Sequence, residues 1–280
     1  MAISEVSKPC SLLKPLNTGS HLCVSEVIYE RIPVMKLSEH FESSGNWLFR
    51  WRSYLPVILI CAGLASLREF KYPGGSHNWD LVWEAVAALV GLLGLAIRVD
   101  AVGHAAPKTS GRNTREQVAD SLNTTGLYSI LRHPLYLGNT LMWLSVALFV
   151  ESWWLAAIVL LVSALYHERI IYTEEVFLER KFGDAFRNWA ARTPAVCPNF
   201  SLWKSPHLPF AWRQALQREY LGLFALITTY FVADIVSDWF YLDKFELDPV
   251  WSGIWAGGVL FFVFIRFLRK QTKLLSAPNR

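Results

Sequence analysis

Six apolar runs alternate with polar connections along the 280-residue chain. A helix needs about 20 apolar residues to cross a bilayer, and somewhat shorter runs can span when neighbouring helices shelter them. The pattern therefore predicts an all-α polytopic membrane protein with about six transmembrane helices. Only Glu151 and Ser152 lie at the junction of the third and fourth runs, which predicts a tight helical hairpin there. The runs cover approximately residues 54–68, 79–99, 135–150, 152–172, 219–239 and 250–268.

Composition supports a membrane protein. The chain is 53% hydrophobic and only 18% charged, against about 25% charged residues in a typical soluble domain. Most of the thirteen tryptophans lie near the ends of the runs, as expected for an aromatic belt at the lipid head groups. This composition argues against a disordered chain, a collagen-like chain or an ordinary cytosolic enzyme. The four cysteines form no C-x-x-C pair, so the sequence predicts no metal site.

Positive charge predicts the orientation in the membrane. The junction of the third and fourth runs has no Lys or Arg, and the connection between the fifth and sixth runs has only Lys244. Residues 169–218 have eight. The positive-inside rule then places both termini and the two long polar connections, roughly 100–134 and 173–218, in the cytoplasm. The modest net charge of +4 follows this topology, so we expect no nucleic-acid partner.

The predicted organisation is one membrane domain with short flanking segments. Residues 1–50 form an N-terminal cytoplasmic segment, in part poorly ordered, and contain no apolar stretch of signal-peptide length. The membrane domain covers residues 51–270, and residues 271–280 form a cytoplasmic tail.

The first polar stretch that suggests chemistry lies just before the third run. Pro134 suits the first position of a helix, because its missing N–H would have no partner there. His133 then becomes the N-cap, with Arg132 beside it. A helix N-terminus next to a cation favours an anion. A capped helix with an interfacial Arg is the alternative interpretation.

The second stretch follows the fourth run. We expect the helix to continue into the polar layer and to stop at Gly183. Glu174 and Glu175 lie just beyond the bilayer edge, and a short interfacial segment with Phe186 and Trp189 on one side comes next. A Glu pair alone is more often part of a solvated helix face.

Together the two stretches resemble the isoprenylcysteine carboxyl methyltransferase family, which shades into the phospholipid methyltransferases. The shared pattern is T-G-x-Y-x-x-x-R-H-P-x-Y-x-G, then a helical hairpin, then E-E-x-x-L-x-x-x-F-G-x-x-[FY]-x-x-[WY]-x-x-R. The resemblance covers roughly residues 95–200, and the methyltransferase core is expected there. The N-terminal segment and the last two runs lie outside it.

The resemblance implies an integral-membrane enzyme that uses S-adenosylmethionine without a Rossmann fold. The cofactor would sit on the cytoplasmic side, between the Arg-His-Pro helix and the segment after the Glu pair. Its carboxylate suits a helix N-terminus or a cation, its ammonium a carboxylate, and its adenine an aromatic slot. The cofactor-binding residues implied by motif position are His133, Tyr136, Gly138, Glu174, Glu175, Phe182 and Gly183.

The methyl acceptor is expected to be a membrane lipid or a lipidated substrate. A carboxylate or phosphate oxygen is already ionised and needs only a cation and the exclusion of water, whereas an amine needs a base. As the catalytic cations we predict Arg132, Arg192 and Arg169. The predicted substrate-binding residues are Arg98, Arg112, Asn113 and His167.

Two other classes of function stay open from the sequence. The first is a membrane reductase, because sterol reductases resemble the same region but use NADPH. Arg180 and Lys181 would then be the small cationic cluster that binds the nucleotide 2′-phosphate. A non-enzymatic transporter or scaffold is the other alternative. Few ionisable residues lie at mid-depth of the runs, which disfavours transport.

Overall fold

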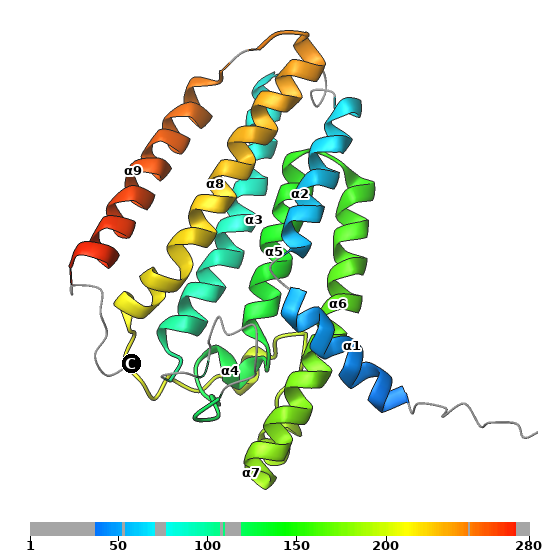
Figure 1. Cartoon of the computed structure of the whole chain (residues 1–280), viewed down its shortest axis with the longest axis vertical. Helices are drawn as coiled ribbons and strands as arrows, with labels where there is room; N and C mark the ends of the chain where they lie inside the picture. Colours follow the sequence, from blue (N-terminus) through cyan, green and yellow to red (C-terminus); the bar gives the residue numbers. More distant parts are fainter. Residues whose placement is uncertain are drawn as a thin grey trace, which may run out of the picture. The chain divides into compact units, whose positions relative to one another are not determined.

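The computed structural model describes residues 37–51, 54–70, 77–106, 109, 119–245 and 247–272. This part of the chain is helical and contains no β-strand (Figure 1). Two short 3-10 helices, η1 (Leu67–Glu69) and η3 (Phe200–Leu202), join longer elements. The α-helices are α1 (Leu37–Trp51), α2 (Leu55–Ser66), α3 (His77–Gly103), α4 (Leu127–Ile130), α5 (Pro134–Phe149), α6 (Trp153–Phe182), α7 (Asp184–Ala190), α8 (Trp212–Leu242) and α9 (Pro249–Gln271).

Each of the six predicted runs lies in a helix, so the all-α expectation is confirmed. Four helices, α3, α6, α8 and α9, are long and apolar enough to span a membrane. Helix α5 is apolar but has only 16 residues, and α2 has 12. Helix α8 begins at Trp212, seven residues before the predicted run, because its first two turns are helical but polar.

The predicted start of α5 and end of α6 have the expected local chemistry. Pro134 is the first residue of α5 and His133 its N-cap, although the His133 side chain makes no capping bond and is free to bond elsewhere. Gly183 ends α6 with a φ of +55°, a conformation that glycine adopts at little cost. Between α5 and α6, the hairpin turn puts Glu151 at the same positive φ of 55°.

Helices α3 and α5 cross at a pair of glycines. A Cβ built on Gly94 would lie 2.6 Å from the carbonyl oxygen of Gly138, and one on Gly138 would lie 2.7 Å from that of Gly94. Only glycine allows two backbones to approach so closely. The crossing brings Arg98, one turn beyond Gly94, against the start of α5.

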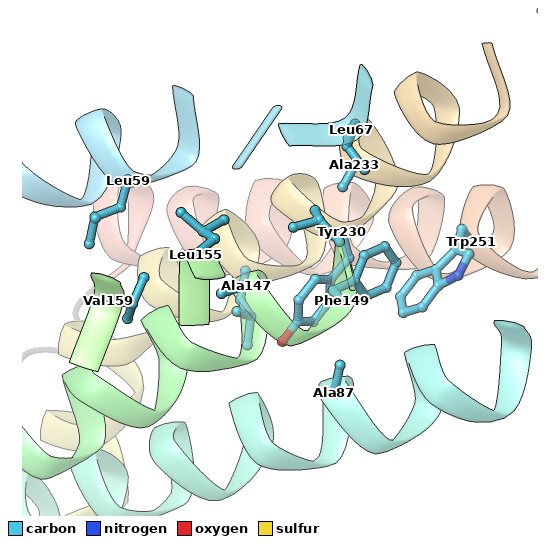
Figure 2. Close-up of a cluster of buried hydrophobic side chains, with 12 residues drawn as sticks. Leu59, Leu67, Ala87, Ala147, Phe149, Leu155, Val159, Tyr230, Ala233 and Trp251 are labelled. Carbon is cyan, nitrogen blue, oxygen red and sulfur yellow. The ribbon is translucent and has the colours of Figure 1, made fainter. Parts of the chain in front are cut away.

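The main apolar core lies near the α5–α6 turn. Phe149 stacks on Tyr230 with ring centroids 4.7 Å apart and meets Trp251 edge-on at 5.1 Å (Figure 2). Ala87 of α3 and Ala147 of α5 are almost fully buried in the same cluster. This end of the bundle therefore owes its order to side-chain packing among α3, α5, α8 and α9.

The opposite end, where α4 and α7 lie, is built differently (Figure 1). Backbone hydrogen bonds join the polar segments before α5 and after α7. Gly126 N donates to Lys204 O at 2.9 Å, Arg132 N to Pro194 O at 2.9 Å, and Asn199 N to Ile130 O at 3.0 Å. The two long polar connections of the sequence thus share one end of the bundle, as the alternation of charge predicts.

The predicted N-terminal segment lies partly outside the described residues. Its described part is α1, which packs on α6 within the unit formed by residues 36–280. Gly45 of α1 faces the carbonyl of Arg169, and Phe41 lies against the Arg169 guanidinium, 3.7 Å from its ring centroid.

Candidate active site

The start of α5 and the polar half of α6 bring four predicted residues into direct contact. His133 Nε2 donates to Glu175 Oε1 at 2.9 Å, and Tyr136 Oη donates to Glu174 Oε1 at 2.6 Å. His133 Nδ1 lies 3.7 Å from Glu174 Oε2. Both carboxylates therefore face the α5 N-terminus. We refer to Arg132, His133, Tyr136, Glu174 and Glu175 as the His-Glu cluster.

The His-Glu cluster combines fixed charge with access to water. Arg132 Nε lies 3.2 Å from Glu175 Oε1, which gives the pair a cation. The His133 side chain is 6% exposed, whereas those of Glu174 and Glu175 are 25% and 23% exposed. A carboxylate has about four acceptor positions, so each Glu keeps lone pairs for a ligand at this open edge.

The segment after α7 holds Arg132 in place. Arg132 donates from its backbone to Pro194 O and from Nη1 to Ala190 O at 3.4 Å. Trp189 Nε1 donates to Tyr128 O at 3.0 Å. Burial, together with the nearby negative charge of Glu174, raises the pKa of Tyr128 above its ordinary value, so its hydroxyl stays protonated.

A stack of four rings leads from the His-Glu cluster into the bundle. His133 stacks on Tyr136 with centroids 5.8 Å apart, Tyr136 on His167 at 4.8 Å, and His167 on Trp143 at 5.3 Å. His167 comes from α6 and the others from α5 or its cap. The stack connects the polar end of the bundle with its interior.

Trp143 also lines a cavity of about 220 Å³ among α2, α3, α5, α6 and α8. Most of its wall is apolar, with Leu59, Met142 and Leu226 among the lining residues. Its polar lining residues include Arg98, Asn139 and Glu219. This lining suits an apolar group with a polar end.

Arg98 is already paired with a carboxylate. Its Nε and Nη2 donate to the two Glu219 oxygens, both at 2.8 Å, and its Nη1 donates to Asn139 Oδ1. The side chains are 20% and 6% exposed. This bidentate pair is nearly neutral overall, so Arg98 offers an anionic acceptor less than the isolated cation expected from the sequence.

A second hollow, of about 570 Å³, lies beside the segment after α7. Trp189 and Trp203 give it aromatic walls, Arg192 and Lys204 give it cations, and Thr193 and Ser201 give it hydroxyls. Trp189 and Thr193 flank Ala190 and adjoin Pro194, the residues that hold Arg132. The wall of the hollow therefore includes neighbours along the chain of the residues that hold Arg132.

The remaining predicted residues lie elsewhere. Gly138 packs on Gly94 of α3, so the close approach that it allows is between helices. Phe182 and Gly183 are at the end of α6, and nothing lies within 4 Å of a Cβ built on Gly183. Arg169 points to α1, where its Nη1 is buried without a hydrogen-bond partner. Arg112 and Asn113 lie outside the described residues.

Sequence reasoning missed Glu219, which turns out to be the partner of Arg98. The only signal was a carboxylate at the first position of the fifth apolar run. Since its partner lies 121 residues earlier, no local pattern could connect the two.

Comparison with known proteins gives one family and two relatives. A phospholipid methyltransferase family model matches residues 84–185. The nickel-cobalt-cadmium resistance protein NccN of Alcaligenes xylosoxydans xylosoxydans is 36% identical over 156 residues, which cover 55% of this chain and 66% of NccN. The cobalt-zinc-cadmium resistance protein CzcN of Cupriavidus metallidurans is 31% identical over 192 residues, which cover 66% of this chain and 84% of CzcN. No solved structure matches the chain.

Proposed function

This chain belongs to the phospholipid methyltransferase family, and we propose that it transfers a methyl group from S-adenosylmethionine to the head group of a membrane lipid. The observation that carries the proposal is the His-Glu cluster. It joins the two halves of the matched region at a water-accessible end of an otherwise apolar bundle. The family model ends at residue 185, so α8 and α9 are additions to the matched core.

The residues present fit S-adenosylmethionine. Its ammonium would find unused lone pairs on Glu174 and Glu175, and its carboxylate would find the α5 N-terminus and the Arg132 guanidinium, which also pairs with Glu175. The hollow with Trp189 and Arg192 has room for the adenosine half. When bound, this group supplies an electrophilic methyl on a sulfonium. Phe182 and Gly183 stay as contacts implied by the family resemblance.

The chain's own contribution is positioning. Tyr136 fixes Glu174 and His133 fixes Glu175, each through a hydrogen bond to a charged acceptor, which is stronger than one between neutral groups. Because the partners lie at the start of α5 and on α6, and a short turn joins these two helices, the two carboxylates are held in place before a ligand arrives. Orientation of this kind lowers the barrier of a two-reactant transfer.

The lipid would place its apolar part in the 220 Å³ cavity and its head group near Arg98 and Glu219. Because that pair carries both charges, a head group with an anionic and a cationic part matches it better than a simple anion does. A buried ion pair is weak evidence of stabilisation, because desolvation of its two charges opposes their attraction. Binding of a lipid head group would explain why the Arg98–Glu219 pair lines a cavity.

We further propose that the end with the His-Glu cluster faces the cytoplasm, as do both termini. S-adenosylmethionine is a soluble ligand, and the loops at this end are rich in Lys and Arg. In a background with the four native cysteines replaced, Leu247→Cys would then react only with a reagent outside the cell. Labelling of Leu247→Cys only from the cytoplasmic side would reverse the topology.

No observation favours the reductase alternative. Arg180, one of the two cations that it would use for the nucleotide phosphate, pairs with Glu42 of α1 at 2.9 Å and is exposed.

Transfer of labelled methyl into membranes tests the proposal. The double variant Glu174→Gln, Glu175→Gln keeps shape but loses both charges, so we expect at least a hundredfold loss of label in lipid. Glu179→Gln is the matched control, because Glu179 lies on the same helix and its ion-pair partner in the described part of the chain is the exposed Arg187. Equal label with the double variant would refute the proposed site, and no label with the native chain would refute the reaction.

The names of the two relatives suggest a setting. We propose that the methylated lipid contributes to resistance to divalent transition-metal ions, because methylation changes the hydrogen bonds and metal ligands that a head group offers. Cells that lack the gene should regain cobalt, zinc or cadmium tolerance with the native chain but not with the Glu174→Gln, Glu175→Gln variant. If the native chain and the double variant restored tolerance equally, resistance would not depend on methyl transfer.

A further inference from the structure

Helix α1 precedes the region that the family model matches, and it presents three different faces. It is not among the four helices long and apolar enough to span a membrane. In Figure 1 it lies across α6 instead of alongside it. Since an α-helix has about 3.6 residues per turn, the side chains of α1 divide into a face against α6, an exposed aromatic face and an exposed polar face.

The face against α6 is closely packed. Gly45 is buried, and a Cβ built on it would collide with Thr173 Oγ1 and with the backbone carbonyl of Arg169. Only glycine lets the two helices approach so closely. Thr173 directly precedes Glu174 in the sequence. The crossing therefore holds α6 at the turn that carries the carboxylates of the His-Glu cluster.

Phe49 extends this face toward the His-Glu cluster. It is 6% exposed and forms a small apolar cluster with Tyr166 and Ile170 of α6, against which Tyr136 packs. Tyr136 in turn donates its hydroxyl to Glu174. Tyr166 also ties the two helices together, because its Oη donates to Leu48 O at 3.2 Å. A displacement of α1 would thus disturb both the carboxylate and its hydrogen-bond donor.

The aromatic face and the polar face of α1 differ in chemistry. Trp47 and Trp51 are 60% and 49% exposed, with ring centroids 6.1 Å apart, and Tyr54 continues the row at 5.2 Å. Trp and Tyr are enriched where a bilayer meets water. A helix with one apolar and one polar face lies in the plane of that interface. The polar face consists of four exposed residues at helical spacing: Glu39, Ser43, Asn46 and Arg50.

The place where α1 crosses α6 agrees with the edge of a bilayer. From its start at Trp153, α6 has no Asp, Glu, Lys or Arg before Glu168, and Arg169 is the next residue. The crossing at Arg169 is therefore where α6 leaves its apolar stretch. Directly after α1, helix α2 exposes the apolar side chains of Val57 and Ile58, as suits a segment that enters the bilayer.

We propose that α1 is a membrane-surface helix that positions the cofactor site, with Gly45 and Phe49 as positioning residues and the lipid head-group layer as the partner of Trp47 and Trp51. The inference rests on the proposed binding of S-adenosylmethionine. The head groups hold α1, and α1 holds the polar half of α6. The two carboxylates are then ordered before the ligand arrives, so its binding energy is not spent on ordering them.

Two cysteine variants test the membrane contact. In the background without native cysteines, Trp47→Cys and Ser43→Cys each carry an environment-sensitive fluorophore, on the aromatic and on the polar face of the same helix. Phosphatidylcholine with a nitroxide near the glycerol should quench residue 47 more strongly than residue 43, and aqueous iodide should give the opposite order. Protection of residue 47 from both quenchers, or equal quenching of both residues by iodide, would overturn the contact and indicate a protein partner or open water.

Gly45→Ala tests the positioning. The added methyl group forces α1 away from α6, and a misplacement of about 1 Å can cost about a hundredfold, so we expect KM for S-adenosylmethionine to rise about ten- to hundredfold. The cluster binds the cofactor and leaves the reacting atoms to other groups, so kcat should stay within about twofold. A purely structural role would reduce the amount of active enzyme and leave KM unchanged. Ser43→Ala, on the exposed polar face, is the matched control.

Hydrogen exchange gives a measurement that needs no turnover. Backbone amides of α6 after Arg169 should exchange faster in Gly45→Ala than in the native chain, whereas amides near Val159, in the main apolar core, should not change. If Gly45→Ala does not fold, Tyr166→Phe replaces it. This variant keeps the ring and loses the hydrogen bond to Leu48 O, so KM should rise about two- to fivefold.

The outcomes separate the two proposals. Folded Gly45→Ala that binds S-adenosylmethionine within about twofold of the native chain overturns the positioning role and leaves methyl transfer standing. A native chain that binds no S-adenosylmethionine refutes the proposed function itself. The quenching pair and the hydrogen exchange then still decide whether α1 lies at the membrane surface and whether it orders α6.

Discussion

The two ends of the bundle use stacked aromatic rings for opposite purposes. Near the α5–α6 turn, Phe149, Tyr230 and Trp251 are at most 5% exposed, and their polar atoms are satisfied. Tyr230 Oη bonds Ser145 Oγ at 2.6 Å, and Trp251 Nε1 donates to Glu84 at 2.7 Å. The polar atoms of these three rings are therefore already paired within the cluster.

At the other end, the stack of His133, Tyr136, His167 and Trp143 ends in carboxylates that are about one quarter exposed and includes a nitrogen without a partner. A ring cluster whose own polar atoms are paired serves packing, whereas exposed charges and unpaired atoms within a ring stack are typical of a functional site. The contrast predicts that substitutions near the α5–α6 turn lower stability, whereas matched substitutions near the His-Glu cluster weaken ligand binding.

Phe149→Ala should give the largest effect. Removing a buried ring that touches Tyr230 and Trp251 leaves a cavity, and such changes cost about 3–5 kcal/mol of unfolding free energy. Binding of S-adenosylmethionine, measured well below the unfolding midpoint, should not change. Phe264→Ala is the control, because the Phe264 side chain on α9 is 57% exposed. A loss of ligand binding in folded Phe149→Ala would break the division.

Gly94→Ala should have an intermediate effect that reaches both ends. The added methyl meets the backbone of Gly138, which cannot move aside as a side chain can, so we expect a loss of about 1–3 kcal/mol of unfolding free energy. Because a shift of α5 at the crossing would also move His133 and Tyr136 at its start, binding of S-adenosylmethionine should weaken as well. Gly253→Ala, where a Cβ meets nothing within 4 Å, should be neutral or slightly stabilising. A loss in only one of the two measurements, unfolding or binding, would show that the crossing does not connect the two ends.

Tyr136→Phe and Tyr230→Phe form the sharpest pair, because each removes one hydroxyl from one end. Tyr136→Phe loses the bond to Glu174 and should weaken binding of S-adenosylmethionine about tenfold, since a hydrogen bond to a charged group contributes about 1.5–3 kcal/mol. Tyr230→Phe should lower the unfolding free energy by about 1 kcal/mol and leave binding unchanged. Calorimetric titration and denaturant unfolding of both variants measure the four values. Equal effects on binding would contradict the comparison.

Much of this arrangement could be predicted from the sequence, because it depends on local patterns. The apolar runs mark the helices, Pro134 marks the start of α5, and Gly183 marks the end of α6. The Arg-His-Pro and Glu-Glu stretches could be expected to meet, because the short junction at Glu151 makes α5 and α6 neighbours.

Contacts between distant helices could not be predicted. The pairing of Arg98 with Glu219 depends on how α3 rotates against α8, and the position of Arg169 depends on α1, which precedes the matched region. Helical periodicity fixes the face of each helix, but the packing of whole helices decides which faces meet. The sandwiching of His167 is of the same kind, since it needs the register of α5 against α6.

The smallest predicted effect concerns Glu151, at the turn that closes the stable end. Its φ of 55° suits glycine, so Glu151→Gly should raise the unfolding free energy by about 1 kcal/mol or less.

Burial, with a smaller effect of the Asp80 charge, raises the pKa of Glu151 to about 7. A carboxyl whose folded-state pKa is raised favours folding below its ordinary pKa, and this contribution is lost as pH rises through about 7. The gain from Glu151→Gly should therefore be larger at pH 8 than at pH 5. Unfolding of both proteins at the two pH values measures it, and a gain that is the same at both would leave backbone strain as the whole effect.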